Sequence, residues 1–337
     1  MLIEPVKKYP RKILIQASSP GKLSPHGISY PDIHQDGSTK MARILNFGSL
    51  NIDHVYQVPH FVRPGETLAS RGYSSFVGGK GCNQSVALAR AGAAVAHAGK
   101  VGHDGVWLKE FLAKTGVDAS LTKISSASTG HAIIQVSGNG ENSIILHGGA
   151  NHDISPEDAA AALEKFGEGD WLLLQNEISS IPEIMRLAHA RGLKIALNPA
   201  PISEELRDYP LDLVSTFILN EIEGSELSGE KEEEKIIAKL AALYPKAAIV
   251  LTLGSRGVRY KDAKQEFCAA SEKVKAIDTT AAGDTFIGYF LADIIAESPV
   301  ETALKNACKA AAICVTRKGA ALSIPERKEL AEKLISR

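Results

Sequence analysis

Residues 278–285 read Asp-Thr-Thr-Ala-Ala-Gly-Asp-Thr, and an apolar helical stretch, 286–292, follows at once. Small residues and a glycine let a backbone approach a ligand closely, and the first amides of a helix lack internal partners. The segment could therefore bind an anion. Asp284 lies in this turn, where a carboxylate could take a proton from a hydroxyl that attacks a phosphoryl group. Taken alone, however, the pattern favours an ordinary helix cap.

Residues 78–84, Gly-Gly-Lys-Gly-Cys-Asn-Gln, form a glycine cluster before a predicted helix. The glycines permit close approach of the backbone to a ligand, and Lys80 and Asn83 could bond hydroxyls or a phosphate. The spacing is neither that of a Walker A loop nor Gly-x-Gly-x-x-Gly. Taken alone, this cluster is typical of a structural turn.

Polar side chains also follow several predicted strands. Alternate residues of an extended segment point the same way, so Asn51 and Asp53 could reach one polyol ligand. Asn220 and Glu223 could serve nucleotide phosphate and a hydrated Mg²⁺, because such cations need few carboxylates. The alternative is an N-cap Asn that starts an acidic, solvated helix. Glu177 could bind a hydroxyl or simply reach solvent.

Two further turns contain glycine. Residues 252–257, Thr-Leu-Gly-Ser-Arg-Gly, follow a predicted strand, and α/β proteins bind ligands at the carboxyl ends of parallel strands. A plain turn is equally compatible. Residues 316–320, Thr-Arg-Lys-Gly-Ala, close an Ala-rich helix and could be a basic C-terminal cap. Most of these patterns follow strands or open helices, and this shared location favours a ligand site over unrelated caps.

The amino-acid composition limits the class of protein to which this sequence can belong. The 337 residues are 44% apolar and 23% charged, as in ordinary globular proteins. A net charge of −1 gives no electrostatic reason to expect nucleic acid or an anionic membrane as partner. Four scattered cysteines and ten histidines show neither a disulfide framework nor metal-ligand spacing. No apolar run approaches membrane-spanning length. We therefore expect a soluble, cytoplasmic protein.

Residues 1–40 differ from everything that follows. They are rich in Pro, Ser, Gly and Lys and lack a sustained apolar period, so we expect a disordered leader. Their excess of basic residues faintly resembles an organellar transit peptide, whereas a secretory signal needs a longer apolar core. A folded domain is expected over 41–337, opening with a strand at 43–48.

From there short apolar runs alternate with helical patterns, which indicates an α/β fold whose mostly parallel sheet is covered on both faces. Helices are expected at 83–90, 105–115, 156–166 and 181–191. Buried strands are expected at 95–100, 171–174, 194–197, 216–219 and 247–253.

Three segments break this rhythm: 52–57, 67–77 and 129–148. They alternate apolar and polar residues as β-strands do, with no helix between 52–57 and 67–77 and none within 129–148. Residues 138–140, Gly-Asn-Gly, lie between two such runs and predict a hairpin. We infer a small extra sheet attached to the α/β body as a lid.

The two glycine segments, 78–83 and 278–285, together resemble the signature motifs of the ribokinase (PfkB-type) sugar kinase family. Smaller blocks resemble the family in the same order: 48–53, 64–67, 128–130, 148–151, 198–201, 252–257 and 315–320. The resemblance runs from about residue 43 to the C-terminus. It implies a three-layer α/β/α body with a β-sheet lid that pairs with a partner's lid in a homodimer.

The resemblance also implies a role for individual residues. The sugar would be held by Asn51, Asp53, Gly79, Lys80, Asn83, Glu177 and Asp284. Asp284 would be the catalytic base, and the backbone amides of Ala281, Ala282 and Gly283 would form the anion hole.

Further residues would bind the nucleotide and cations. ATP would contact Asn220, Thr252, Gly254, Gly257, Gly283 and Cys308, and Glu223 would act through Mg²⁺ and water. A monovalent cation such as K⁺ would lie at Asp278, Thr280, Arg317, Gly319 and Ser323. Cys308 stands where some relatives place a polar residue near the adenine, which leaves the nucleotide preference open.

The activity that the resemblance implies is transfer of the γ-phosphoryl group of ATP to the 5-hydroxyl of D-ribose. One alternative is a family member that acts on another sugar or a nucleoside; the paired Asn51 and Asp53 favour a small polyol, because a nucleobase needs apolar or aromatic walls. The other is a non-catalytic sugar-binding protein, against which the intact Lys80, Gly283 and Asp284 speak.

Overall fold

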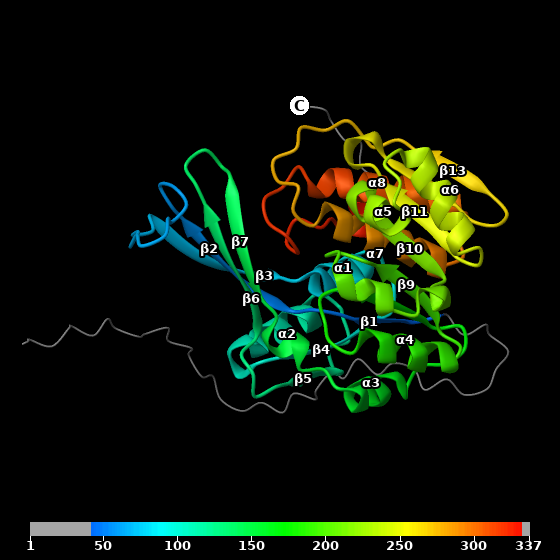
Figure 1. Ribbon diagram of the computed structural model, residues 1–337, viewed down its shortest axis with the longest axis horizontal. Coiled ribbons are helices and arrows are strands. Elements are labelled where there is room, and N and C mark those ends of the chain that lie inside the picture. The colour runs from blue at the N-terminus through cyan, green and yellow to red at the C-terminus, as the bar shows by residue number, and fades with distance from the viewer. Residues whose placement is uncertain (1–41, 332–337) are drawn as a thin grey trace, which may run out of the picture. The chain divides into compact units, whose positions relative to one another are not determined.

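The structure is a computed structural model that describes residues 42–331 (Figure 1). The predicted leader, 1–40, lies outside the described residues. Within them, strands and helices build one large sheet with helical layers and one small sheet. No helix in this part of the chain is long and apolar enough to cross a membrane.

The large sheet has nine strands in the order β13-β12-β11-β10-β9-β8-β1-β4-β5. All neighbours from β5 to β11 pair in parallel, whereas β12 and β13 add an antiparallel edge. The strands are β1 (Ile44–Phe47), β4 (Val95–Val101), β5 (Thr122–Ile124), β8 (Trp171–Gln175), β9 (Lys194–Asn198), β10 (Thr216–Asn220), β11 (Ala248–Thr252), β12 (Val258–Lys261) and β13 (Glu266–Ala269).

Helices cover both faces of this sheet because successive strand residues point to opposite sides. In β1, Ile44 joins one apolar cluster, whereas Leu45 and Phe47 join the other. The first cluster contains residues of α1 (Lys80–Arg90), α2 (Val106–Lys114), α7 (Ala282–Ile295) and α8 (Val300–Cys314). The second contains residues of α3 (Pro156–Leu163), α4 (Ile181–Ala190) and α6 (Glu233–Leu243), with α5 (Glu221–Ser228) packed beside it. The body is therefore a three-layer α/β/α structure.

The small sheet consists of β3 (Gly72–Gly78), β2 (Asn51–Gln57), β6 (Gly130–Val136) and β7 (Asn142–His147), in that order. Its outer pairs are antiparallel and its central pair, β2 with β6, is parallel. Figure 1 shows it projecting from the body, and β2 follows β1 after a short connection. The hairpin predicted at 138–140 joins β6 to β7.

The fold class expected from the sequence is confirmed, with shifts at element ends. The predicted strand at 67–77 begins only at Gly72, and the helix predicted from 83 begins at Lys80. The helix predicted from 286 begins at Ala282, so Asp284 lies inside its first turn and not in a turn before it. A left-handed Ala281, with φ 60°, starts the helix early. The sequence did not predict β5 and β13, which are the short edge strands of the large sheet, or β12, which pairs with β13.

Candidate active site

Asp284 lies in the first turn of α7, beside backbone amides with no internal partner. Within residues 42–331, the amides of Ala281, Gly283 and Asp284 have no hydrogen-bond acceptor, whereas the Ala282 amide donates to the Thr279 carbonyl at 3.3 Å. Free amides and the helix dipole make this terminus a favourable place for a negative charge. Of the predicted anion-hole amides, those of Ala281 and Gly283 are thus available, and that of Ala282 is engaged.

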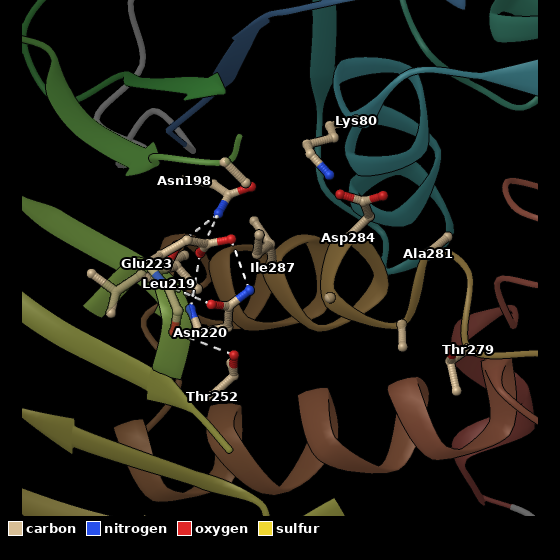
Figure 2. A pocket seen from close by; sticks show the side chains of 14 residues that line it. Lys80, Asn198, Leu219, Asn220, Glu223, Thr252, Thr279, Ala281, Asp284 and Ile287 are labelled. Atoms are coloured by element: carbon tan, nitrogen blue, oxygen red, sulfur yellow. Dashed lines mark hydrogen bonds between the residues drawn. The ribbon is translucent and has the colours of Figure 1, made fainter. Parts of the chain in front are cut away.

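Two side chains of α1 hold the Asp284 carboxylate. Asn83 Nδ2 donates to Oδ2 at 2.9 Å, and Gln84 Nε2 donates to Oδ1 at 2.8 Å. The ammonium group of Lys80 points toward the same carboxylate (Figure 2). The predicted glycine motif and the predicted acidic motif therefore meet, although they lie some two hundred positions apart in the chain.

Lys80 faces several carboxylates at once. Burial lowers the pKa of Lys80, but the negative charges of Asp284, Glu177 and Glu223 outweigh this effect and raise the pKa above its ordinary value. Lys80 is therefore firmly protonated. A compact ammonium charge at this position can balance acids that face it from both sides of the site.

Two acids that line the site also have raised pKa values, which for a carboxyl group favours the neutral form. Burial, with the nearby charge of Glu177, raises the pKa of Asp53 from 3.8 to about 6. Burial also raises the pKa of Glu177, although Lys80 and Ser49 partly oppose this. Glu177 accepts hydrogen bonds from the Ser49 hydroxyl and, at 3.0 Å, from the Lys80 amide. Raised pKa values in a cleft are a common feature of ligand-binding acids.

A cavity of about 860 Å³ lies between the small sheet and the loops at 277–284 and 318–322. All the side chains and the glycine predicted to hold the sugar line it: Asn51, Asp53, Gly79, Lys80, Asn83, Glu177 and Asp284. A second cavity, of about 250 Å³, lies on the body side of Lys80 and Asp284 (Figure 2). Both cavities are lined by Lys80, Ala281 and Asp284, so the carboxylate stands at their junction.

The smaller cavity gathers part of the predicted nucleotide set. Asn220 and Glu223 line it, together with Thr252 and Gly283. Asn220 caps α5: its side chain accepts from the Glu223 amide, and the Glu223 carboxylate accepts from the Asn220 amide at 2.9 Å. The capping alternative is therefore realised, yet the same two side chains still face the cavity.

Three residues of the predicted nucleotide set stand apart. Gly254 and Gly257 follow β11 with positive φ but line neither cavity. Cys308 is only 5% exposed and packs in the apolar cluster of α7 and α8. The structure does not bring these three residues to the two cavities, and their nucleotide contacts stay predictions.

The residues predicted to hold a monovalent cation lie around Asp278. One carboxylate oxygen of Asp278 accepts from the Thr280 amide at 2.9 Å and from its hydroxyl, and the other accepts from the Gly319 amide at 2.9 Å. Burial raises the pKa of Asp278, but these hydrogen bonds outweigh it and lower the pKa. The Arg317 guanidinium pairs with Glu329, and Ser323 is buried against Cys314. Asp278 thus joins the 278–280 loop to the loop at 317–319.

Sequence reasoning missed several supporting side chains. Gln84 belongs to the glycine cluster 78–84 and Ser49 to the block 48–53, but the sequence alone assigned neither a role. Asn151 belongs to a quoted block, and its Nδ2 donates to Asn51 Oδ1 at 2.7 Å, which orients Asn51 toward the cavity. Such partners come from distant segments, so only the folded chain reveals them. Gly48 is one example of how tightly distant segments pack here, because a Cβ on Gly48 would lie 2.3 Å from Gln175 Oε1.

Comparisons with known proteins agree with this architecture. The model of the pfkB family carbohydrate kinases matches residues 41–327. A ribokinase of Haemophilus influenzae is 40% identical over 296 residues, which cover 85% of this chain and 96% of that protein.

Solved structures are also similar. A crystal structure of ribokinase from Cryptococcus neoformans in complex with ADP has a TM-score of 0.77 and 35% identity, covering 86% of this chain and 99% of that one. Ribokinase of Arabidopsis thaliana complexed with ribose and ATP has a TM-score of 0.76 and 28% identity, covering 87% and 98%. The family model spans most of the chain, and the Haemophilus influenzae relative is 40% identical over 85% of it. This chain belongs to the pfkB family of carbohydrate kinases.

Proposed function

We propose that this chain is an ATP-dependent ribokinase that phosphorylates D-ribose at O5. The observation that carries this proposal is the position of Asp284 at the junction of a larger, acid-lined cavity and a smaller cavity at the amino end of α7. The ribokinase relatives, one of them solved with ribose and ATP, support the choice of substrates. The larger cavity would take the sugar, and the smaller cavity the phosphates.

The acid-lined cavity suits a small polyol. Carboxylates at Asp53 and Glu177 accept hydrogen bonds from hydroxyl groups, whereas the Asn51 and Asn83 amides can both donate and accept. Asn83 Oδ1 is buried and has no hydrogen-bond partner within residues 42–331. A buried polar atom without a partner is costly, so a sugar hydroxyl that donates to it would gain affinity.

The reaction needs little covalent chemistry from the protein. O5 of ribose attacks the γ-phosphorus of ATP, the bond from that phosphorus to the β–γ bridging oxygen breaks, and ADP leaves. Asp284 accepts the O5 proton as the O–P bond forms. The amides of Ala281 and Gly283 donate to the transferring phosphoryl group, and Lys80 balances its charge.

Two cations would support the nucleotide. Among the described residues no group of three or more His, Cys, Asp or Glu side chains could hold a metal ion. This fits Mg²⁺, which keeps most of its waters and binds phosphate oxygens, with Glu223 contacting it through water. A monovalent cation such as K⁺ would be held by oxygens of Asp278, Thr280, Arg317, Gly319 and Ser323. It would supply positive charge behind the anion site.

We further propose that the small sheet is a lid that also forms a homodimer. Phe76, Ile144 and Leu146 are 46%, 51% and 59% exposed. All three line the sugar-side cavity, on the same face of the sheet as Asp53. Exposed apolar patches of this kind mark interaction surfaces, and a second lid would cover this one. The cytoplasmic location stays a prediction.

The test is a phosphorylation screen of the purified full-length chain. Ribose, deoxyribose, fructose, tagatose and ribonucleosides are each incubated with ATP and Mg²⁺, and products are identified by mass spectrometry and phosphorus NMR. We expect ribose 5-phosphate with the highest kcat/KM. A higher kcat/KM for another sugar or a nucleoside would reassign the substrate within the family. Ribose binding without turnover would contradict the kinase proposal and favour a sugar-binding protein.

A further inference from the structure

A chain of buried side-chain amides runs from Asp284 into the body. Gln84 on α1, Gln175 on β8 and Asn46 on β1 are each 0% exposed. Gln175 lines neither cavity, so it has no direct role in the proposed chemistry. Buried polar networks are costly unless every member is hydrogen-bonded, so the presence of this network needs a physical explanation.

The side-chain nitrogen of each of these three amides donates two hydrogen bonds. Gln84 Nε2 donates to Asp284 Oδ1 at 2.8 Å and to Asn198 Oδ1 at 3.3 Å. Gln175 Nε2 donates to Gln84 Oε1 at 2.7 Å and to Asn46 Oδ1 at 3.0 Å. Asn46 Nδ2 in turn donates to the carbonyl of Gly81 at 2.7 Å and to Ser85 Oγ at 2.8 Å.

The groups at the two ends of this amide network, Asp284 and the Gly81 carbonyl, fix the direction of its hydrogen bonds. An ionised carboxylate and a carbonyl only accept hydrogen bonds, so Gln84 must present its nitrogen to Asp284 and Asn46 must present its nitrogen to Gly81. Both amides then turn their oxygens to Gln175, whose nitrogen serves both. Gln175 Oε1 is left buried without a partner among the described residues.

The unpartnered Gln175 oxygen indicates that the orientation of the three amides is set by the groups at the ends of the network. Leaving a buried acceptor unpaired costs about 1–3 kcal/mol. Turning the Gln175 amide around would place its oxygen against the oxygens of Gln84 and Asn46 unless those two amides turned as well. Oxygen would then face the carboxylate of Asp284 and the carbonyl of Gly81, which is worse. The arrangement with one unpaired oxygen is therefore the more favourable one, and in it an N–H group of Gln84 points at Asp284.

We propose that Gln84 is a positioning residue for Asp284 and that Gln175 acts through Gln84 to hold it in place. Gln84 donates to Oδ1 and Asn83 donates to Oδ2, so the carboxylate plane is fixed in a residue that lines both cavities. A base held this way meets O5 without rotating first. The inference rests on the proposed kinase activity, because it concerns the same carboxylate.

Three variants of the full-length chain test this: Gln84→Met, Gln175→Met and the double variant. Methionine keeps the length and volume of glutamine but cannot donate. We expect Gln84→Met to lower kcat about 10- to 100-fold, because small displacements of a catalytic group have effects of this size. Gln175→Met should lower kcat about 3- to 10-fold, and both should leave KM for ribose and ATP within about twofold.

The double variant distinguishes positioning from general damage. If Gln175 acts only through Gln84, the double variant should match Gln84→Met and not multiply the two losses. Tyr289→Phe is the matched control. Tyr289 lies on α7, as Asp284 does, and the substitution removes one buried hydrogen bond, from the Tyr289 hydroxyl to the Pro325 carbonyl at 2.7 Å. It should lower the melting temperature but leave kcat within about twofold.

Unchanged kcat in Gln84→Met, multiplied losses in the double variant, or an equal kcat loss in Tyr289→Phe would each overturn the inference. Crystal structures separate this failure from failure of the kinase proposal. If the wild-type chain has no turnover, the proposed activity is wrong, yet the Asp284 carboxylate should still rotate in Gln84→Met. An unrotated carboxylate would overturn the positioning role in either case.

Discussion

The body side and the small-sheet side of the cavity are built differently. On the body side, Asp284 is bonded by Asn83 and Gln84, backed by fully buried amides, and set in a helix of fourteen residues. On the small-sheet side, Asp53 lies on a four-stranded sheet whose neighbouring apolar side chains are largely exposed. One side is fixed before the sugar arrives, whereas the other still has apolar surface to bury.

This difference suggests a division of labour. Turnover depends on atoms held to a fraction of an ångström, which dense packing and hydrogen bonds provide. Sugar capture tolerates, and gains from, a wall that closes over its ligand. Substitutions on the body side should therefore lower kcat, and substitutions on the small sheet should mainly raise KM for ribose.

Asp284→Asn should have the largest effect. The amide keeps the shape of the carboxylate but cannot take the O5 proton, so kcat should fall by about 10³- to 10⁴-fold. Ribose affinity, measured by calorimetry, should stay within about threefold. A kcat within tenfold of the wild type would show that another group acts as the base.

Lys80→Met comes next. It leaves the carboxylates of Asp284, Glu177 and Glu223 without the charge that balances them. The variant also lacks the charge that balances the transferring phosphoryl group, so kcat/KM should fall roughly 10²- to 10³-fold in a steady-state assay. Lys100→Met is the matched control, because Lys100 pairs with Asp153 and Asp158 outside both cavities. Equal losses in the two variants would refute a specific role for Lys80.

Asp53→Asn should act on binding and on stability in opposite directions. Ribose KM should rise about 10- to 100-fold with little change in kcat, because a charge-assisted hydrogen bond is lost. The pKa of Asp53 is raised in the folded chain from 3.8 to about 6. Between these values the unfolded chain gives up its proton first, so wild-type stability falls as the pH rises through this window.

The resulting penalty above pH 6 is about 3 kcal/mol, from a shift of about two pKa units at 1.36 kcal/mol each. Asp53→Asn should therefore be more stable than the wild type at pH 7, and the two should converge near pH 4. Urea unfolding at both pH values measures this. A variant that is less stable than the wild type at pH 7 would contradict the raised pKa.

Ile144→Asp should have the smallest effect on turnover. A charge on the exposed apolar face opposes burial against a second lid, so light scattering should detect monomers where the wild type forms dimers. We expect ribose KM to rise about 3- to 10-fold, with kcat nearly unchanged. Ile222→Asp is the control, because Ile222 is 74% exposed on α5, away from the small sheet. An unchanged oligomeric state in Ile144→Asp would refute the proposed interface.

The sequence predicted the parallel sheet well because its buried strands are continuous apolar runs, such as Trp171–Gln175. The resemblance to the family also grouped seven residues that together line the larger cavity, because family motifs carry that information. The sequence could not predict that α7 begins at Ala282, because this start depends on a left-handed Ala281. Nor could it predict Gln175 as a partner of Gln84, ninety-one positions away, because that contact exists only once β8 lies beside β1 and α1.

The most direct test is a crystal structure of the full-length chain with ribose and a non-hydrolysable ATP analogue. We predict that O5 of ribose lies within hydrogen-bonding distance of the Asp284 carboxylate, about 2.6–3.2 Å. The γ-phosphoryl oxygens should face the amides of Ala281 and Gly283. Ribose bound with O5 turned toward Asp53 or Glu177, and away from Asp284, would contradict the assignment of Asp284 as the base.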